Sequence, residues 1–172
     1  MDRPGPAGAG LCVFNPRDCS VTDLGADLGH NTNNVGELVA LGICFRFIMS
    51  LAPAPTRVFI FTDSLLAANA ATSTKEPRSH PVLVRALRAL FAEASVSLQI
   101  DIHWIRGHAG VGGNERADRI AKRFAKLSLG AVVAKPSPEL FNFSSSTSPW
   151  PFGLCGDDVP FTSGLPAVSL TC

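Results

Sequence analysis

The sequence has little charge, no closely spaced cysteine pair and no long apolar run, and each of these shortages excludes a class of protein. Only 17% of its 172 residues are charged and the net charge is +1, so the chain is no polycation and nucleic-acid binding would depend on local charge. The five cysteines form no CxxC pair and no Cys/His cluster with zinc spacing. An odd cysteine count without a secretory signal predicts reduced thiols and a cytoplasmic or nuclear location.

No apolar run in the sequence is long enough to cross a membrane. The longest, residues 38–53, contains Arg46 and falls short of the roughly 20 residues that a spanning helix needs. We therefore expect a helix buried in a protein core and no membrane partner. Because 46% of the 172 residues are hydrophobic, the chain can form the core of one ordinary domain.

Periodicity and turn residues predict an α/β fold. The clearest strand is Arg57–Thr62, which is β-branched and aromatic and lies between Pro55 and Asp63. A strand–helix–strand–helix order predicts parallel strands covered by helices. Residues 1–8, rich in glycine and proline, predict a turn. The other expected elements are strands at 11–14, within 21–30 and at 95–105, and helices at 36–51, 64–71, 80–94 and 114–127. Residues 131–172 are rich in serine and proline and predict a disordered tail beside a domain at 1–130.

Three acidic residues are placed where a metal site would need them. Glu37 is expected in the first turn of a helix, Asp63 follows the best strand, and Asp118 lies in the last helix. Carboxylates from separate elements suit Mg²⁺ or Mn²⁺, and two such ions can activate water for phosphodiester hydrolysis. Each residue also has a simpler explanation, since the helix dipole favours Glu37, capping favours Asp63, and a solvated helix face accommodates Asp118. The functional hypothesis therefore depends on the combination.

The segment His103–Lys122 (HWIRGHAGVGGNERADRIAK) decides between these explanations. It resembles type 1 ribonuclease H, in which an aromatic residue and a GH pair end a strand and a glycine-bearing loop leads into an N-E-x-A/C-D helix start. The GH-x-G-x-x-GNE wording is most similar to ribonuclease H domains of non-LTR retrotransposons. Two further matches follow the family's order: Phe61–Ser64 resembles its T-D-S strand end, and Thr32–Glu37 resembles its T-N-N-x-x-E.

The resemblance implies a metal-dependent endonuclease that hydrolyses the RNA strand of an RNA–DNA hybrid. By the same resemblance Glu37, Asp63 and Asp118 bind the metal ions, and His108 on a mobile loop assists proton transfer or product release. Short polar side chains can meet the 2′-hydroxyls of RNA in its shallow minor groove. The resemblance assigns hybrid contacts to Thr32, Asn33 and Asn34, and a weaker phosphate contact to Ser64. Six basic residues between 106 and 126 add local positive charge.

The start of the sequence departs from the family pattern. Residues 4–10 resemble the Pro/Gly turn that follows the family's first strand, a central strand ending in a metal-bridging Asp. The resemblance therefore implies an N-terminally truncated ribonuclease H-like mixed sheet with flanking helices, lacking that strand. Two alternatives stay open: a catalytically inactive fragment that only binds nucleic acid, and another ribonuclease H-like protein such as an integrase or exonuclease. A former fusion to a reverse transcriptase also stays open.

Overall fold

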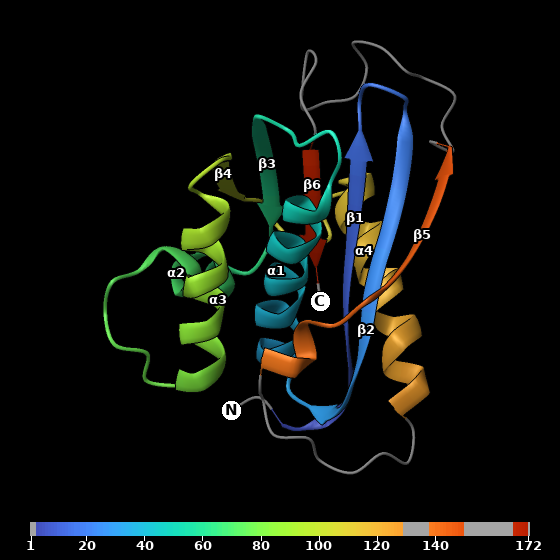
Figure 1. Ribbon diagram of the computed structural model, residues 1–172. Helices are drawn as coiled ribbons and strands as arrows, with labels where there is room; N and C mark the ends of the chain where they lie inside the picture. Colours follow the sequence, from blue (N-terminus) through green and yellow to red (C-terminus); the bar gives the residue numbers. More distant parts are fainter. Residues whose placement is uncertain (1–2, 129–137, 150–166, 172) are drawn as a thin grey trace.

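The protein forms a mixed six-stranded sheet with helices on both faces (Figure 1). The computed structural model describes residues 3–128 and 138–149, together with the backbone of 167–171. The predicted α/β fold with flanking helices is therefore confirmed. In chain order the elements are β1 (Gly5–Asn15), β2 (Ser20–Asn31), α1 (Asn33–Ser50), β3 (Arg57–Thr62), α2 (Leu65–Thr72), α3 (Pro81–Ala94), β4 (Gln99–Trp104), α4 (Gly112–Ala125), the 3-10 helices η1 (Lys126–Ser128) and η2 (Pro138–Phe141), β5 (Ser144–Pro149) and β6 (Ala167–Thr171).

The strand order in the sheet is β4-β3-β6-β1-β2-β5. β1 and β2 form a long antiparallel pair, and β5 extends that pair at the outer edge of β2. β3 and β4 are parallel, as the alternation of strands and helices predicts. The last strand, β6, lies between β3 and β1, parallel to the former and antiparallel to the latter. The C-terminal segment thus joins the two halves of the sheet.

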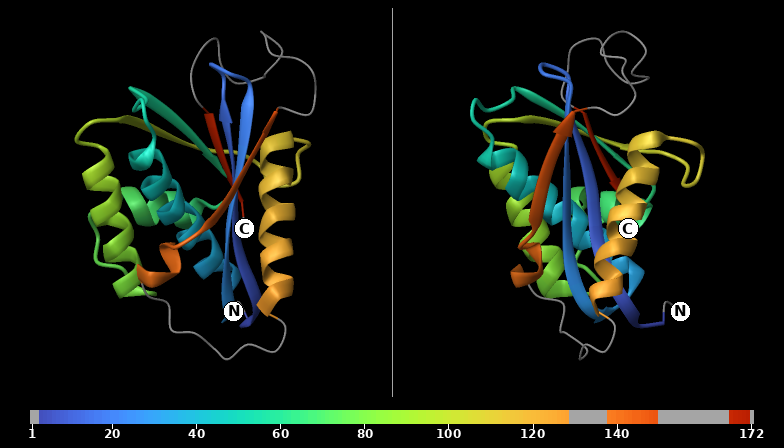
Figure 2. Two further views of the ribbon diagram at one scale, coloured as in Figure 1. Left: turned by 45° about the vertical axis from the view of Figure 1, so that its right-hand side comes forward. Right: turned by 90° about the vertical axis from the view of Figure 1, so that its right-hand side faces the viewer.

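Helices cover the two faces unequally (Figure 2). α1 and α3 lie on one face, where a large core of buried aliphatic and aromatic side chains includes Leu41, Phe45, Ile60 and Leu87. α4 lies alone on the other face and packs over β1 and β2, with a smaller buried cluster around Ala117. Because α4 also begins near the end of β3, it connects this second face to the edge where the expected site lies.

Helix α1 is buried around most of its circumference, as its apolar composition predicts. It begins at Asn33, because Thr32 caps it by accepting a hydrogen bond from the backbone N–H of Val35 at 3.3 Å. The start lies three residues before the expected one at 36, and Glu37 consequently lies in the second turn and not the first. Among the described residues, no helix is both long and apolar enough to cross a membrane.

A strand occupies part of the N-terminal segment, residues 1–8, for which a turn was expected, so that expectation was wrong. β1 begins at Gly5, and Gly8 and Gly10 lie inside it. A Cβ on Gly8 would meet the carbonyl oxygen of Ala121 at 2.3 Å, and one on Gly10 would meet that of Ala117 at 2.4 Å. These glycines therefore allow α4 to approach the strand closely, which is a second reason for glycine in a sequence besides a turn.

Part of the expected disordered tail belongs to the sheet. Phe141 of η2 is buried against Gly42 of α1, and β5 and β6 pair with β2, β1 and β3. Residues 129–137, 150–166 and 172 lie outside the described part of the chain, so the expectation for them stays a prediction.

The cysteines also differ from expectation. Cys12 and Cys44 are free and buried, whereas Cys19 at the β1–β2 turn is disulfide-bonded. The prediction that the thiols are reduced therefore fails at Cys19, because an odd count does not prevent one pair from forming.

Candidate active site

Asp63 lies immediately after β3 and is held by three neighbouring segments. Its Oδ2 accepts a hydrogen bond from Nδ2 of Asn114 on α4, at 3.3 Å. Its backbone carbonyl accepts one from Nε1 of Trp104 at the end of β4, at 3.0 Å. Gly107 lies so close that a Cβ there would be 2.7 Å from Asp63 Oδ2. The two parallel strands, the loop after β4 and helix α4 therefore converge on this one residue.

A second carboxylate, Glu37, reaches the same place from α1. The hydroxyl of Ser64 donates a hydrogen bond to Glu37 Oε2, and Ser64 follows Asp63 directly in the chain. The same hydroxyl accepts a hydrogen bond from the backbone N–H of Ala67 at 3.1 Å, which caps helix α2. Ser64 is buried, so this double role fixes the position of Glu37 beside the end of β3.

Asp118, the third predicted ligand, lies on α4 one turn beyond Asn114. Its Oδ2 accepts a hydrogen bond from Lys122 at 2.6 Å, and its side chain is only 16% exposed. Within the described residues, no group of three or more His, Cys, Asp or Glu side chains is close enough together to hold a metal ion. The structure thus joins Glu37 and Asp63 through Ser64, and joins Asp63 to the helix of Asp118 without bringing all three carboxylates into one cluster.

The remaining predicted residues lie at the ends of neighbouring elements. His108 is exposed, with a positive φ of 52°, in the loop before α4. Thr32 caps α1, and Asn33 and Asn34 form its first turn, with Asn33 exposed. Thr32 therefore has a structural role as the helix cap, and Asn33 presents an exposed side chain beside it.

Sequence reasoning missed three contacts of the site. It did not assign Asn114 to Asp63, the Trp104 indole to the Asp63 carbonyl, or the Ser64 hydroxyl to Glu37. The signal for the first was a polar Asn among the residues that helix α4 buries, where a side chain needs a hydrogen-bond partner. The other two depend on how β4 and α1 lie beside β3, which no local pattern contains.

Comparisons with known proteins agree with this arrangement. Ribonuclease H from Ralstonia nicotianae is 34% identical over 112 residues, covering 60% of this chain and 72% of that protein. Ribonuclease H from a Cyanothece species is 30% identical over 132 residues, covering 72% of this chain and 82% of that protein. The fold resembles a solved type 1 RNase H with the type 2 active-site motif, at a TM-score of 0.51 and 22% identity, over 74% of this chain and 76% of that one.

The family comparison covers the part of the chain that forms the site. The sequence model described as RNase H matches residues 1–126, which include the N-terminal hairpin, the end of β3 and all of helix α4. A match over most of the chain, supported by relatives at 30% identity or more, identifies the family. The chain belongs to the RNase H family.

Proposed function

We propose that this ribonuclease H cleaves the RNA strand of RNA–DNA hybrids as a metal-dependent endonuclease. The observation that carries the proposal is the position of Asp63, the residue at which the ends of β3 and β4, the Gly107 loop and α4 meet. Glu37 lies beside it through Ser64. The two relatives described above are both ribonucleases H, which supports the same activity for this chain.

The donor atoms suit a divalent cation of the Mg²⁺ or Mn²⁺ type. Glu37, Asp63 and Asp118 offer hard carboxylate oxygens and no sulfur, and such oxygens are the ligands that these ions prefer. Glu37 and Asp63 would hold the metal from α1 and β3. Asp118 would join them by exchanging its contact with Lys122, an i,i+4 partner whose side chain is 66% exposed and therefore held weakly. A bound cation supplies the charge that activates water and stabilises the leaving oxygen.

The other residues act on the substrate. Asn33 would meet the 2′-hydroxyls of the RNA strand, with the half-buried Thr32 and Asn34 beside it, since Asn33 is exposed at the start of α1. His108 would move a proton or help to release the product, because its exposed loop allows it to approach and leave. Ser64 acts mainly by positioning Glu37, and contact with phosphate is a secondary role for it.

A specific observation favours a second candidate, a domain that binds nucleic acid without cutting it. In the family that this chain resembles, the first strand is central in the sheet and ends in an Asp that bridges the metal ions. In this chain, β6 lies in a central position, between β3 and β1. The sequence of β6, AVSLT, contains no carboxylate. If β6 replaces that strand, the site has fewer metal ligands and slower or no cleavage follows.

The sequence GH-x-G-x-x-GNE supports descent from a ribonuclease H domain of a retrotransposon, in which a reverse transcriptase would be the fused partner.

Cleavage of a hybrid with a labelled RNA strand separates the two candidates. The full chain is incubated with hybrid, with duplex RNA and with duplex DNA, each with Mg²⁺, with Mn²⁺ or with EDTA. The proposal expects internal cuts in the RNA of the hybrid alone, and none in EDTA. Binding of the hybrid without cutting, measured by fluorescence anisotropy, would establish the binding candidate instead. Cleavage of duplex DNA would point to an integrase or exonuclease type of activity.

A further inference from the structure

Helix α4 borders a basic hollow on the side that faces β2. The hollow has a volume of about 340 Å³ and is lined by Asp23, Arg116, Arg119, Ile120 and Arg123. It contains three arginines and one aspartate, so its formal charge is +2, whereas the whole chain carries only +1. Positive charge is therefore concentrated at this place.

Arg116 forms the fixed inner wall of the hollow. Its Nε donates to Asp23 Oδ1 at 2.7 Å and its Nη2 donates to Asp23 Oδ2 at 3.1 Å, a two-pronged arrangement. The side chains of Arg116 and Asp23 are 21% and 15% exposed, and the hydrogen bonds that Arg116 donates to Asp23 raise the pKa of Arg116. Asp23 thus neutralises and orients Arg116, which leaves the positive charge of the hollow on the other two arginines.

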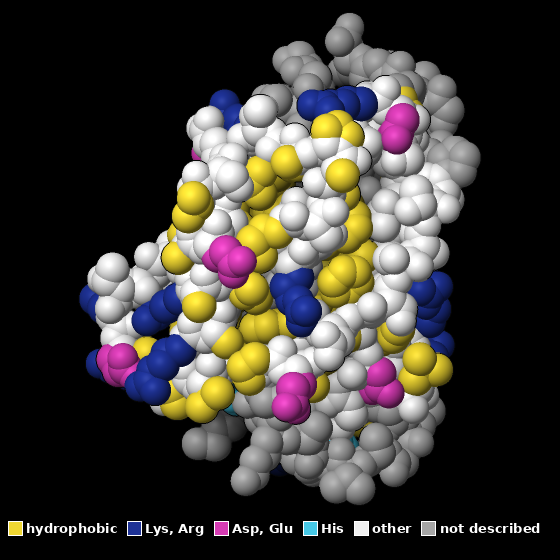
Figure 3. Space-filling view, viewed as in Figure 1, with side chains coloured by type: hydrophobic (Ala, Val, Ile, Leu, Met, Phe, Trp, Pro, Cys, Tyr) yellow, Lys and Arg dark blue, Asp and Glu magenta, His cyan; other side chains and the backbone are white. Residues whose placement is uncertain are grey.

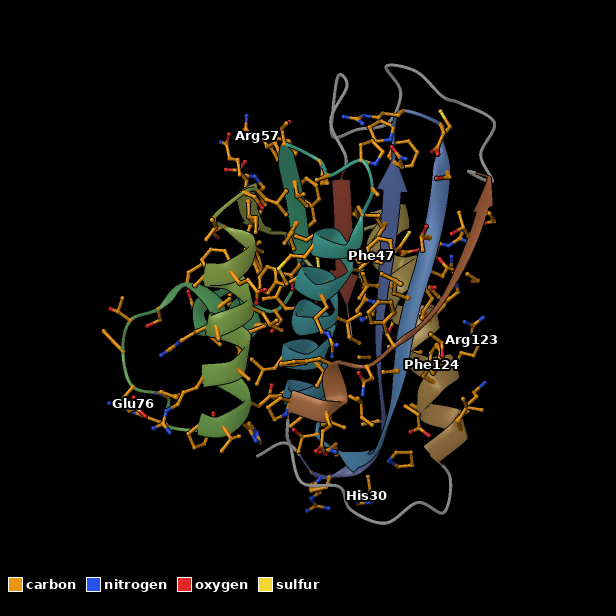
Figure 4. All side chains as sticks on the ribbon, viewed as in Figure 1. His30, Phe47, Arg57, Glu76, Arg123 and Phe124 are labelled. Atoms are coloured by element: carbon orange, nitrogen blue, oxygen red, sulfur yellow. The ribbon has the colours of Figure 1, made fainter. Side chains whose placement is uncertain are left out.

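Arg119 and Arg123 form its outer wall. Both are exposed, and they lie one turn apart on the same side of α4. Within the described part of the chain, no carboxylate forms an ion pair with either one. The guanidinium of Arg123 lies 5.3 Å from the ring centre of Phe124, next to which it appears in Figure 4. Lys and Arg side chains also gather along the edge of the molecule that α4 occupies in Figure 3.

The hollow and the candidate active site lie on opposite flanks of one helix. At about 100° per residue, Asp118 is roughly 160° around α4 from Arg116. A helix with its side chains is about 10–12 Å wide, whereas duplex nucleic acid carries a charge every ~1.7 Å along its axis. Over that width a duplex carries about six or seven phosphates, so a hybrid that extends past Asp63 and across α4 has phosphates for the hollow to bind.

We infer that the hollow of Arg116, Arg119, Arg123 and Asp23 binds a phosphate of the hybrid backbone outside the cleavage site. Arg119 and Arg123 supply the charged contacts, because a guanidinium presents a planar pair of donors that matches phosphate oxygens. Asp23 acts as a positioning residue by holding Arg116 in place. The inference rests on the proposed function, because it takes the hybrid of that function as its ligand.

The test is the salt dependence of hybrid binding in EDTA, where cleavage cannot occur. The affinity for a fluorescent hybrid is measured by anisotropy between ~50 and 200 mM salt. The logarithm of the affinity falls linearly with the logarithm of the salt concentration, with a slope of about −0.9 for each phosphate that the protein contacts. The variant Arg119→Gln/Arg123→Gln is expected to lose about 0.9 of that slope, because the hollow binds one phosphate. The control Arg17→Gln/Arg46→Gln removes two exposed arginines that do not line the hollow and is expected to keep the wild-type slope. Arg119→Lys/Arg123→Lys should retain most of the slope, because the charges remain.

The outcomes separate this inference from the proposed function. An unchanged slope in Arg119→Gln/Arg123→Gln, or an equal loss in the control, overturns the phosphate site even if the wild-type chain cuts hybrids. Loss of slope in that variant alone supports the site even if the wild-type chain binds without cutting. A wild-type chain that does not bind the hybrid overturns both. Thermal unfolding of each variant verifies that the exposed substitutions leave the fold intact.

Discussion

Asn114 on α4 donates a hydrogen bond to the carboxylate of Asp63 at the end of β3, across 3.3 Å. Asn114 is 2% exposed, so its amide has little access to water and depends on partners within the protein. The contact ties the helix that carries Asp118 to the strand that carries Asp63. It therefore sets how far apart these two carboxylates lie.

Replacing Asn114 tests whether this contact positions the site. We expect Asn114→Ala to lower kcat/KM for hybrid cleavage by about 10- to 100-fold, as the loss of a partner that orients a metal ligand commonly does. The Mg²⁺ concentration for half-maximal activity should rise, which a merely structural role would not require. Asn69→Ala, an exposed asparagine on α2, is the matched control. Unchanged metal dependence in Asn114→Ala would contradict the positioning role.

The close approach of β1 and α4 predicts a sharp difference between two glycines. Gly10→Ala places a Cβ 2.4 Å from the backbone of Ala117 and Ala121, and should lower the free energy of unfolding by about 1–3 kcal/mol. Gly5→Ala has nothing within 4 Å and should stay within about 0.5 kcal/mol of wild type. Urea unfolding measures both. Equal effects of the two substitutions would mean that α4 does not pack against Gly10.

The central position of β6 predicts a specific crosslink. Val13 and Val168 are register partners across the antiparallel β1–β6 pair. Cα atoms of such partners lie about 4.5–5.5 Å apart, within the range of a disulfide. We expect Val13→Cys/Val168→Cys to form the disulfide under mild oxidation, detected by peptide mass. Val13→Cys/Ala167→Cys is the control, since Ala167 is the register partner of Phe14 and successive residues of a strand point to opposite faces. Equal crosslinking of both pairs would show that β6 has no fixed register.

Much of this fold is predictable because its signals are local. The run Arg57–Thr62 is a β-branched strand, the polar residues before α1 cap it, and α4 has one apolar face, so all three elements are found close to their expected limits. The resemblance to the family likewise names Glu37 and Asp63, which the structure brings together through Ser64.

The parts that were missed depend on partners distant in sequence. Glycines such as Gly8 and Gly10 are typical of turns, and only the close approach of α4 explains why they lie in a strand. The SSSTSP sequence of β5 has no alternation, because the strand lies at the edge of the sheet, with the side chains of residues 144–148 exposed. β6 pairs with β1 and β3 from more than a hundred residues away, and no local pattern specifies that choice. The contact between Asp118 and Lys122 is an ordinary i,i+4 helix pair, and the sequence alone does not show that Asp118 makes it.

The most direct measurement compares hybrid cleavage by wild type, Asp63→Asn and Asp18→Asn in Mg²⁺. Asp63→Asn keeps the size of the side chain and removes its charge, so cleavage should fall by roughly 100-fold or more while the fold persists. Asp18 lies at the β1–β2 turn, where Asn can accept the same turn hydrogen bond, and Asp18→Asn should cut at the wild-type rate. A wild-type chain whose metal-dependent cleavage survives Asp63→Asn would contradict the assignment of the reaction to this carboxylate.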